Sequence, residues 1–515
     1  MVPIYVLDAE TDPFAHGRII RPFAMCLYSE SQRYKKVIWS PNCAKLMARE
    51  IRQLPTCTVY AHNGGKFDFH FLIPYANKST IKIINGRIAV MYIGNAKLVD
   101  SWLLIPMALG TYKKEEIDYD LFLEDVREQH KQTIIDYLVS DCENLYELLT
   151  GFQKVVGKKL TIGQAAFTKL RSSGIDIPKL TESHDVTFRP FYFGGRCEAI
   201  RKGTTEGKLT YLDINSAYPW AMTHDHPTGS HYNIGRKLPR FGGPWFAKIV
   251  AINRRALCIR DKNGLTFDCE YGTFFATGWE IATALEHGLI DIEKVLQVYY
   301  PKNTVNFSEY VYETKALRDA AKAAGNEIEQ IAYKFLMNSA YGKFATDPRD
   351  WQNYYLDDIG TEPDEGYEWL TDVGNLSIYQ TPTYDGEGFY DVATAASITG
   401  KVRAFLLDSM ARCQDVIYCD TDSIVCKSYA SSIKIGKELG NWKVEDTGHK
   451  MCIAGKKLYA FFGDNGIKVA SKGVRLTASE IERIANGEEI EHCKETPTFS
   501  IKKGQSYVKR KIKRT

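Results

Sequence analysis

The hydrophobic pattern of the chain alternates between the two-residue period of a strand and the longer period of a helix. Residues 3–10 form an apolar run that ends in acids, and this run predicts a buried strand. Residues 59–68 predict a second strand and a glycine turn, followed by a helix from about Asp68 to Tyr75. Residues 133–149 place apolar side chains along one helical face. The first third of the chain is therefore predicted to mix strands and helices in one domain.

The rest of the chain continues this mixture. The pattern of residues 209–222 predicts a strand that ends in an acid and is followed by a turn. Residues 223–305 contain short strand-like runs broken by proline and glycine, and we expect this stretch to be irregular. From Ser308 to Tyr341 the pattern becomes helical, and Ala324-Gly325-Asn326 divides it into two helices that we expect to be antiparallel. The pattern as a whole predicts a mixed α/β (α+β) protein of several domains.

Two aspartates lie at the tip of a predicted hairpin. Apolar runs at 416–418 and 424–426 flank Asp420-Thr421-Asp422-Ser423. Because side chains alternate along an extended chain, we expect Asp420 and Asp422 to project to the same side. Two carboxylates held so close repel each other unless a cation lies between them. The alternative is a polar turn with two solvated acids.

Composition and length favour a soluble protein with several cores. At 515 residues the chain is too long for one core, and 44% hydrophobic with 25% charged residues is ordinary for globular proteins. The net charge of +3 means that local basic patches must bind any polyanion. The 12 cysteines form no CxxC pair, which favours a reduced intracellular setting over a zinc site or a disulfide framework. No apolar run has transmembrane length, and the first strand begins almost at Met1, so we expect no signal, transit or membrane-spanning segment.

Four acids lie on the predicted elements of the first domain. Asp8 and Glu10 are two residues apart at a strand end, Asp68 begins a helix, and Asp141 shares a helical face with Tyr137. Taken singly, a polar strand end, a helix cap and a solvated charge are the simpler interpretations. Together the acids suit two hard divalent cations about 4 Å apart, which can hold both reacting oxygens of a phosphodiester. The set predicts a two-metal site in which Tyr137 orients the attacking water.

These residues resemble the three exonuclease motifs of family B DNA polymerases. The matching segments are Asp8-Ala-Glu10, Asn63-x-x-x-Phe67-Asp68 and Tyr137-x-x-x-Asp141. The resemblance implies an RNase H-like 3′→5′ exonuclease domain over residues 1–155, with Asn63 in contact with DNA. Lys114 matches the lysine that the protein-primed members of this family add to the same site.

Three further segments resemble the polymerase motifs of the same family. Asp213-x-x-Ser-Ala-Tyr218-Pro resembles the first, with Ala217 in place of leucine, and the hairpin acids resemble the third. The resemblance implies that Asp213, Asp420 and Asp422 hold two Mg²⁺ ions, with Mn²⁺ as a substitute. It also implies that Tyr218 packs under the sugar of the incoming nucleotide and excludes a 2′-hydroxyl. The second motif matches Lys334-x-x-x-Asn338-Ser-Ala-Tyr341-Gly342, and with Lys322 it implies contacts to the triphosphate and the nascent base pair.

Motifs that contact DNA in this family also have counterparts. Tyr192-x-Gly194-Gly195 implies template binding, because glycine leaves backbone N–H groups open to a phosphate, although a plain glycine turn is the alternative. Thr399-x-x-x-Arg403 implies contacts with template and primer. Lys457 and Tyr459 match the Lys-x-Tyr element, in which the lysine reaches the primer-terminal phosphate and the tyrosine supports it.

The resemblance implies an RNase H-like exonuclease domain joined to a right-hand polymerase with two insertions. The implied segments are the connector (156–208), palm (209–224 and 392–450), first insertion (225–305), fingers (306–346), second insertion (347–391) and thumb with a basic tail (451–515). In protein-primed members the first insertion contacts the terminal protein and DNA, and the second supports strand displacement. Residues 350–400 carry many acids and no lysine or arginine, so we expect either a repulsive wedge, a dock for a basic partner or a solvated loop.

The implied function is a DNA-directed DNA polymerase with a proofreading exonuclease, which replicates a linear viral or plasmid genome by protein-primed initiation and strand displacement. The implied partners are template–primer DNA, dNTPs and a terminal protein, with no membrane. We expect a monomer in the cytoplasm of a bacterial host cell. Two alternatives are a nucleic-acid-primed polymerase of the same family and a DNA-binding exonuclease without polymerase activity.

Overall fold

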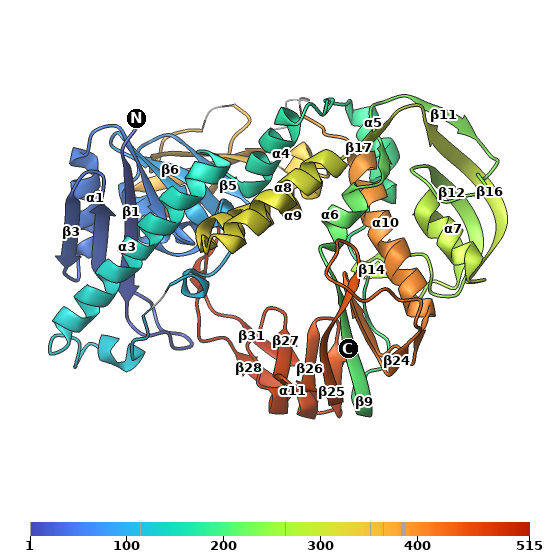
Figure 1. Cartoon of the computed structure of the whole chain (residues 1–515). Helices are drawn as coiled ribbons and strands as arrows, with labels where there is room; N and C mark the ends of the chain where they lie inside the picture. The colour runs from blue at the N-terminus through green and yellow to red at the C-terminus, as the bar shows by residue number, and fades with distance from the viewer. Residues whose placement is uncertain (1, 114, 263, 351, 364, 383–387) are drawn as a thin grey trace.

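The computed structural model describes residues 2–113, 115–262, 264–350, 352–363, 365–382 and 388–515. In Figure 1 the N-terminal domain lies on the left, and helices α8 (Ser308–Ala323) and α9 (Glu327–Phe344) lie at the top centre. The long strands β9 (Gly203–Ile214) and β25 (Trp442–Gly455) lie below, to the right of centre. No helix within the described ranges is long and apolar enough to cross a membrane.

The N-terminal domain is built on a ten-stranded sheet with the order β19-β20-β18-β5-β6-β7-β4-β1-β2-β3. Its first strands along the chain are β1 (Ile4–Thr11), β2 (Pro22–Ser29), β3 (Tyr34–Trp39), β4 (Cys57–Ala61), β5 (Thr80–Ile84), β6 (Arg87–Ile93) and β7 (Ala96–Asp100). Strand β1 pairs in parallel with β4 and antiparallel with β2. The strand predicted over residues 3–10 is therefore central, which explains its nearly continuous apolar run.

Helices cover both faces of this sheet. On one face lies α3 (Lys131–Val156), whose Ile134, Leu138 and Leu145 pack with residues of β1 and β2. On the other lies α1 (Cys43–Gln53), through Met47 and Ile51. The helix predicted over 133–149 is confirmed and is longer at both ends. The short helix α2 (Asp68–Leu72) begins at Asp68, as predicted, and a 3₁₀ turn continues it to Tyr75.

The connector links the N-terminal domain to the helical hairpin of α8 and α9. It contains α4 (Ile162–Ser172), α5 (Glu182–Phe188) and β8 (Cys197–Ala199). Both α3 and α4 pack against α9, and Phe167 of α4 meets the ring of Phe344 at 5.0 Å. The predicted fingers are therefore held from two sides by preceding parts of the chain.

A second sheet has the strand order β27-β26-β25-β9-β23-β22-β8. Its remaining strands are β22 (Tyr418–Asp420), β23 (Ser423–Cys426), β26 (Leu458–Gly463) and β27 (Gly466–Ser471). Helices α6 (Ala217–Met222) and α10 (Val392–Ala411) pack on one face of it, where Val402 and Leu406 share a core with Leu212 and Ile424. The predicted boundary between palm and thumb, at residue 451, lies inside β25, so a single strand passes from one into the other.

The first insertion is not irregular, and that prediction was wrong. Strands β11 (Tyr232–Gly235), β12 (Phe246–Asn253), β15 (Tyr271–Thr277) and β16 (Ile290–Pro301) form a four-stranded sheet. Helix α7 (Gly278–Glu286) packs on it, and Trp245, Phe274 and Ile281 are buried in a separate core. Pro239, Gly242, Gly243 and Pro244 lie between β11 and β12, whereas Pro227 and Gly272 lie inside strands.

The acidic second insertion extends the N-terminal sheet. Its strands are β18 (Gln352–Asp358), β19 (Glu368–Val373) and β20 (Leu376–Pro382), and β18 pairs with β5. Leu356 and Ile378 are buried in the N-terminal core, and Lys78 forms ion pairs with Asp357 and Asp358. A wholly solvated loop is therefore excluded for the described part of this insertion. Residues 351, 364 and 383–387 lie outside the described residues.

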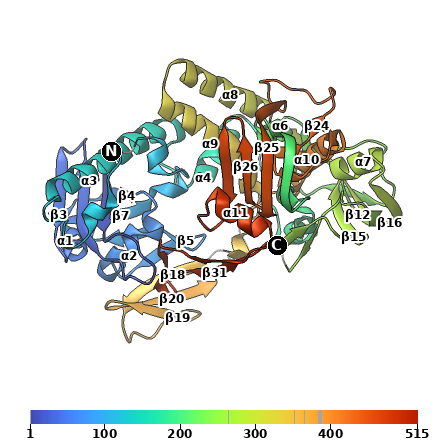
Figure 2. The same ribbon diagram turned by 90° about the horizontal axis from the view of Figure 1, so that it is seen from below.

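The basic C-terminal segment returns to the N-terminal domain (Figure 2). After α11 (Ala478–Ala485), strand β28 (Ile490–Cys493) pairs with β31 (Lys509–Ile512), and β29 (Thr498–Ser500) pairs with β30 (Gly504–Ser506). The ring of Phe499 lies 5.5 Å from that of Phe67, and Tyr507 donates a hydrogen bond to the Arg18 carbonyl oxygen. The tail is thus an ordered ribbon that joins the thumb to the N-terminal domain.

Candidate active sites

Three carboxylates converge at the C-terminal part of β1. Asp8 and Glu10 of β1 and Asp141 of α3 each place one oxygen so that all three lie within 4.8 Å of one another. Two-residue spacing on a strand and the crossing of α3 over the sheet produce this convergence. The fourth predicted ligand, Asp68, is 2% exposed, and its Oδ1 has no hydrogen-bond partner. Burial, and then the charge of Asp8, raises the pKa of Asp68 well above its usual range.

The glycine turn before Asp68 is required by close packing. A Cβ on Gly65 would lie 2.7 Å from Oδ2 of Asp100, and Asn63 has a φ of +63°. Arg87 donates to Oδ1 of Asn63 at 2.9 Å and to Oδ2 of Asp100 at 2.6 Å. The sequence analysis did not single out Arg87, because its partners lie on other strands and turns. DNA binding by Asn63 stays a prediction.

Tyr137 lies beside this cluster on α3. Its hydroxyl is 3.3 Å from that of Tyr119, and the side chain is buried. Burial first, and then the Tyr119 hydroxyl and the Asp141 charge, raises the pKa of Tyr137 above its usual value. The hydroxyl therefore keeps its proton and can orient a water molecule or a phosphate oxygen by hydrogen bonding. Lys114, the predicted additional lysine of this site, lies outside the described residues.

The second carboxylate group forms where the hairpin meets β9. Asp420 pairs with Ser423 across the hairpin, and Ser423 pairs with Asp213 of β9. The N–H of Ile214 donates to the Asp422 carbonyl oxygen at 2.8 Å. Asp422 lies in the turn rather than in an extended strand, and Thr421 beside it has a φ of +59°. The predicted alternation of side chains along one strand is therefore wrong, and the pairing of β9 with β23 brings Asp213 to the turn.

These three acids form a more open group than the first one. Among the described residues, only Asp8, Glu10 and Asp141 bring three ligand atoms within 4.8 Å of one another. Burial, and then the charges of Asp213 and Asp420, raises the pKa of Asp422 to about 6. Burial and like charges act together on Asp422. The alternative interpretation, a polar turn with two solvated acids, therefore does not describe this group. Both groups consist of carboxylate oxygens, which fit Mg²⁺ or Mn²⁺.

Lys457 and Tyr459 lie next to the hairpin acids. Lys457, in the turn between β25 and β26, places Nζ 3.0 Å from Oδ1 of Asp420. Tyr459 is buried, and its hydroxyl is 3.1 Å from that of Tyr211. Lys457 thus pairs with a carboxylate here, and its contact with a primer phosphate stays a prediction. The buried position of Tyr459 suits the supporting role predicted for it.

The predicted nucleotide-binding residues lie on α6, α8 and α9. The ring of Tyr218 stacks on that of Tyr341, with centroids 4.1 Å apart and an interplanar angle of 11°. Burial raises the pKa of Tyr341 to about 12, and the charge of Asp422 adds to this shift. Lys322 and Lys334 are exposed, and Asn338 is half-buried. The structure brings the tyrosines together near the hairpin acids, while binding of a nucleotide by these residues stays a prediction.

The loop of residues 192–196, here called the glycine loop, contacts the turn formed by Thr421 and Asp422. This turn is called the catalytic turn below, after its predicted role. A Cβ on Gly195 would lie 2.7 Å from Oγ1 and 2.8 Å from Cγ2 of Thr421, whereas a Cβ on Gly194 would meet nothing within 4 Å. The N–H of Thr421 donates to the Arg196 carbonyl oxygen at 2.6 Å. Gly195 is thus required by this close approach. Template binding by the loop stays a prediction.

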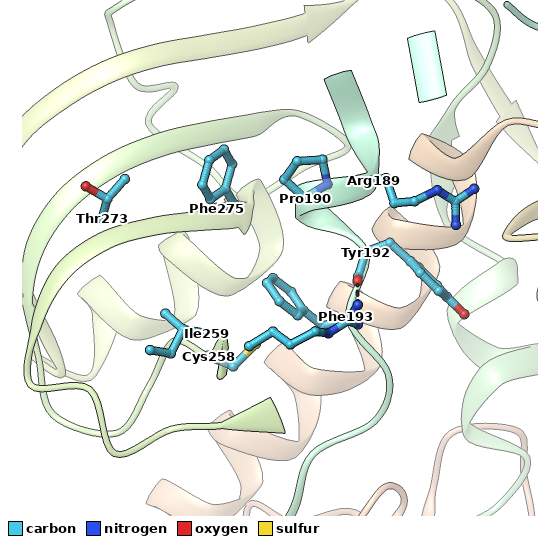
Figure 3. A pocket seen from close by; sticks show the side chains of 9 residues that line it. Arg189, Pro190, Tyr192, Phe193, Cys258, Ile259, Thr273 and Phe275 are labelled. Atoms are coloured by element: carbon cyan, nitrogen blue, oxygen red, sulfur yellow. Dashed lines mark hydrogen bonds between the residues drawn. The ribbon is translucent and has the colours of Figure 1, made fainter. Parts of the chain in front are cut away.

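A cavity of about 410 Å³ lies behind the glycine loop (Figure 3). Its lining residues are Arg189, Pro190, Tyr192, Phe193, Cys258, Ile259, Arg260, Thr273 and Phe275. The ring of Tyr192 points away from the cavity, and Phe193 lies at the cavity's edge. Arg260 donates a hydrogen bond of 3.4 Å to the Tyr192 carbonyl oxygen. Phe193 is buried and packs with Cys258 and Phe267, so the cavity adjoins a loop that is partly packed on this side.

The predicted DNA contacts of Thr399 and Arg403 need a correction. Thr399 is buried and donates to the Ala396 carbonyl oxygen at 3.2 Å. Arg403 is 2% exposed, forms an ion pair with Glu280 of α7, and donates to the carbonyl oxygens of Phe193 and Gly194. A guanidinium so enclosed has no face left for a DNA phosphate. Arg403 instead holds the glycine loop, and its buried partner was missed because Glu280 lies 123 residues away.

Gly195→Ala is expected to reduce primer extension roughly tenfold or more. A new methyl group must displace Thr421 or the loop, and overpacking of this kind costs about 1–3 kcal/mol. Extension rates on a primed template measure the effect, with digestion of single-stranded DNA as the control for an intact N-terminal domain. Gly194→Ala, whose Cβ has open space, provides the matched control for thermal stability. An unchanged extension rate in Gly195→Ala would show that the catalytic turn tolerates displacement.

Comparison with known proteins agrees with this arrangement. A DNA-directed DNA polymerase of Enterobacteria phage PRD1 is 34% identical over 99% of this chain and 98% of its own length. A probable DNA polymerase of Ascobolus immersus is 25% identical over 75% of the chain, which spans only 34% of that protein. The structure of Phi29 DNA polymerase complexed with primer-template DNA superimposes with a TM-score of 0.75 at 17% identity, covering all of both chains. This likeness confirms the predicted fold, an exonuclease domain joined to a right-hand polymerase.

The sequence model of DNA polymerase type B, organellar and viral, matches residues 111–438. This match covers more than half of the chain, from the end of the first carboxylate domain through the hairpin acids. The chain therefore belongs to the organellar and viral type B DNA polymerases.

Proposed function

We propose that this DNA-directed DNA polymerase adds dNTPs to a primer end at Asp213, Asp420 and Asp422 and removes mispaired 3′ ends at Asp8, Glu10, Asp68 and Asp141. The observation that carries the proposal is the presence of two separate carboxylate groups in one chain, each enclosed by different elements. The residues around each group differ, and these differences support the two opposite reactions.

At the polymerase site the chain positions the two substrates. Lys322 and Lys334 are exposed cations on the finger helices and would neutralise the triphosphate. The stacked Tyr218 and Tyr341 offer an aromatic surface for the sugar and base of the incoming nucleotide. Lys457 would exchange its Asp420 partner for the primer-terminal phosphate when DNA binds. Two divalent cations held by the three aspartates would polarise the primer hydroxyl and neutralise the developing phosphate charge.

At the exonuclease site the chain holds a phosphodiester for attack by water. Tyr137 keeps its proton and would orient the attacking water, and Asn63, fixed by Arg87, would contact the primer strand. Asp68 is buried with one oxygen lacking a hydrogen-bond partner, which fits a metal ligand. Mg²⁺ is the proposed metal at both sites, with Mn²⁺ as a substitute.

The proposed partners are template–primer DNA, dNTPs and a terminal protein that supplies the first hydroxyl. Solved structures of Phi29 DNA polymerase contain primer-template DNA with incoming nucleotides, and single-stranded DNA. The first insertion supports a protein partner, because it is a separate folded unit with an exposed Phe241 beside Arg240. We propose a monomer that acts in the cytoplasm of a host cell. Priming by a nucleic acid is the alternative.

Primer extension with the purified chain tests this function. A labelled primer on a longer template should be extended with dNTPs and Mg²⁺, and chelation by EDTA should stop both extension and digestion. Digestion without extension would leave only the exonuclease interpretation. For priming, a labelled dNTP should become bound to a candidate terminal protein in the absence of any nucleic-acid primer. Extension that always requires a nucleic-acid primer would contradict protein priming.

Neutralising the tip of the second insertion tests its proposed role in strand displacement. Glu362, Glu365 and Glu368 are exposed acids, and exposed like charges repel a DNA strand mainly at low salt. The triple variant Glu362→Gln, Glu365→Gln, Glu368→Gln is expected to displace strands about two- to fivefold more slowly on gapped duplex. The difference should disappear at high salt, while extension on single-stranded template stays unchanged. Unchanged displacement at low salt would exclude a repulsive wedge.

A further inference from the structure

The ion pair between Glu280 and Arg403 connects the first insertion to the polymerase site. Arg403 donates from Nε to Oε1 of Glu280 at 2.7 Å and from Nη2 to Oε2 at 3.0 Å. Its remaining nitrogen, Nη1, donates to the carbonyl oxygens of Phe193 at 2.6 Å and Gly194 at 2.9 Å. One guanidinium thus bridges a carboxylate of α7 and two carbonyl groups of the glycine loop.

Glu280 is held in a fixed position by its own helix. It is 3% exposed, and Oε2 accepts hydrogen bonds from the N–H and the Oγ1 of Thr277 in a capping box. Helix α10 approaches this cap closely, because a Cβ on Gly400 would lie 3.0 Å from Oε2 of Glu280. The carboxylate therefore has one position available, and the planar guanidinium of Arg403 is oriented by it.

The clamp holds the middle of the glycine loop, at Phe193 and Gly194, while the Phe193 ring also packs with Cys258 and Phe267. The cavity of about 410 Å³ adjoins Tyr192 and Phe193 (Figure 3). Gly195 and Arg196, which follow the clamped residues in the loop, touch the catalytic turn through Thr421. A displacement of the loop would disturb its contact with the turn that carries Asp422.

We propose that Glu280 is a positioning residue for DNA synthesis, which sets the glycine loop against the catalytic turn through Arg403. The first insertion thereby contributes to the polymerase site itself, in addition to any contact with a protein partner. This inference rests on the proposed template contact of the glycine loop. Glu280 acts by fixing the position of the Arg403 guanidinium. Removing the charge of Glu280 would leave the buried charge of Arg403 without compensation.

Glu280→Gln tests the proposal with the full-length protein. Glutamine can still cap α7, but its amide group cannot accept both hydrogen bonds from Arg403. We expect the Kd for template–primer DNA to rise about tenfold and extension at saturating DNA to fall about tenfold. Digestion of single-stranded DNA should change less than about twofold, which shows an intact fold.

Asp408→Asn is the matched control, because Asp408 of α10 pairs with His287 at the other end of α7 and does not touch the loop. Asp408→Asn is expected to leave the Kd for template–primer DNA and the extension rate within about twofold of the wild-type values, whatever its melting temperature. A lower melting temperature of Glu280→Gln with unchanged Kd and extension would overturn the proposal, because the ion pair would then only stabilise the fold.

Two further variants keep the outcomes distinct. If Glu280→Gln also loses digestion, Arg403→Lys replaces it, because lysine keeps the charge but cannot span the carboxylate and both carbonyl groups. Unchanged synthesis in folded Arg403→Lys would overturn the proposal. Gly195→Ala separates the role of Glu280 from the template contact of the glycine loop. If it lowers template affinity and Glu280→Gln does not, only the role of Glu280 is wrong. If neither lowers it, the template contact of the loop is wrong.

Discussion

Asp422→Asn is expected to reduce primer extension roughly a thousandfold or more while digestion of single-stranded DNA continues. Asp422 lies in the catalytic turn between Asp420 and the strand that carries Asp213. A neutral amide cannot provide the charge that holds a divalent cation, and the cation supplies several kcal/mol of transition-state stabilisation. Each 1.4 kcal/mol is a factor of ten in rate. Single-turnover extension with saturating dNTP and Mg²⁺ measures the loss.

Asp415→Asn is the appropriate control for this variant. Asp415 lies just before the same hairpin, far from its tip, where it forms ion pairs with Arg201 and Lys427. Exposed ion pairs contribute little to stability, so extension should stay near the wild-type rate. Extension by Asp422→Asn at the wild-type rate would show that the metal assignment is wrong.

The local elements were predictable because their signals are local. The helix of Asp141, the helix that begins at Asp68 and the hairpin of Asp420 each follow from periodicity and turn residues within a few positions. The membership of each carboxylate group followed from resemblance to known motifs. Asp8, Glu10 and Asp141 lie together, and the pairing of β9 with β23 brings Asp213 to the hairpin acids. Lys114, the predicted additional lysine, lies outside the described residues.

The contacts that complete the sites were not predictable, because they join segments far apart in the chain. Arg403 carries a charge in a motif known for DNA contacts, and its burial depends on Glu280, 123 residues earlier. The pairing of β18 with β5 similarly places an acidic segment beside the N-terminal domain. Neither partner has a sequence pattern of its own, since a strand edge or a buried acid is defined only by what packs against it.

The two carboxylate groups consist of the same oxygen ligands, and burial together with neighbouring carboxylates raises the pKa of one acid in each, Asp422 and Asp68. At the hairpin, Lys457 pairs with Asp420, so part of the repulsion is balanced by a cation that DNA can take over. At the proposed exonuclease site, Asp68 is buried beside Asp8, and its raised pKa reflects both desolvation and repulsion. The charged form of Asp68 is therefore disfavoured there in the absence of a metal ion.

Asp68→Asn is accordingly expected to remove digestion of single-stranded DNA and to raise the melting temperature of the metal-free protein. Burial and the charge of Asp8 disfavour the charged form of Asp68, and a neutral amide of the same shape avoids that cost. Digestion should fall at least about a hundredfold, because one metal ligand is lost, while primer extension is retained. Glu143→Gln, an exposed acid on α3, should change neither property. A lower melting temperature with digestion retained would mean that Asp68 stabilises the fold as a charged cap of α2 and does not serve the reaction.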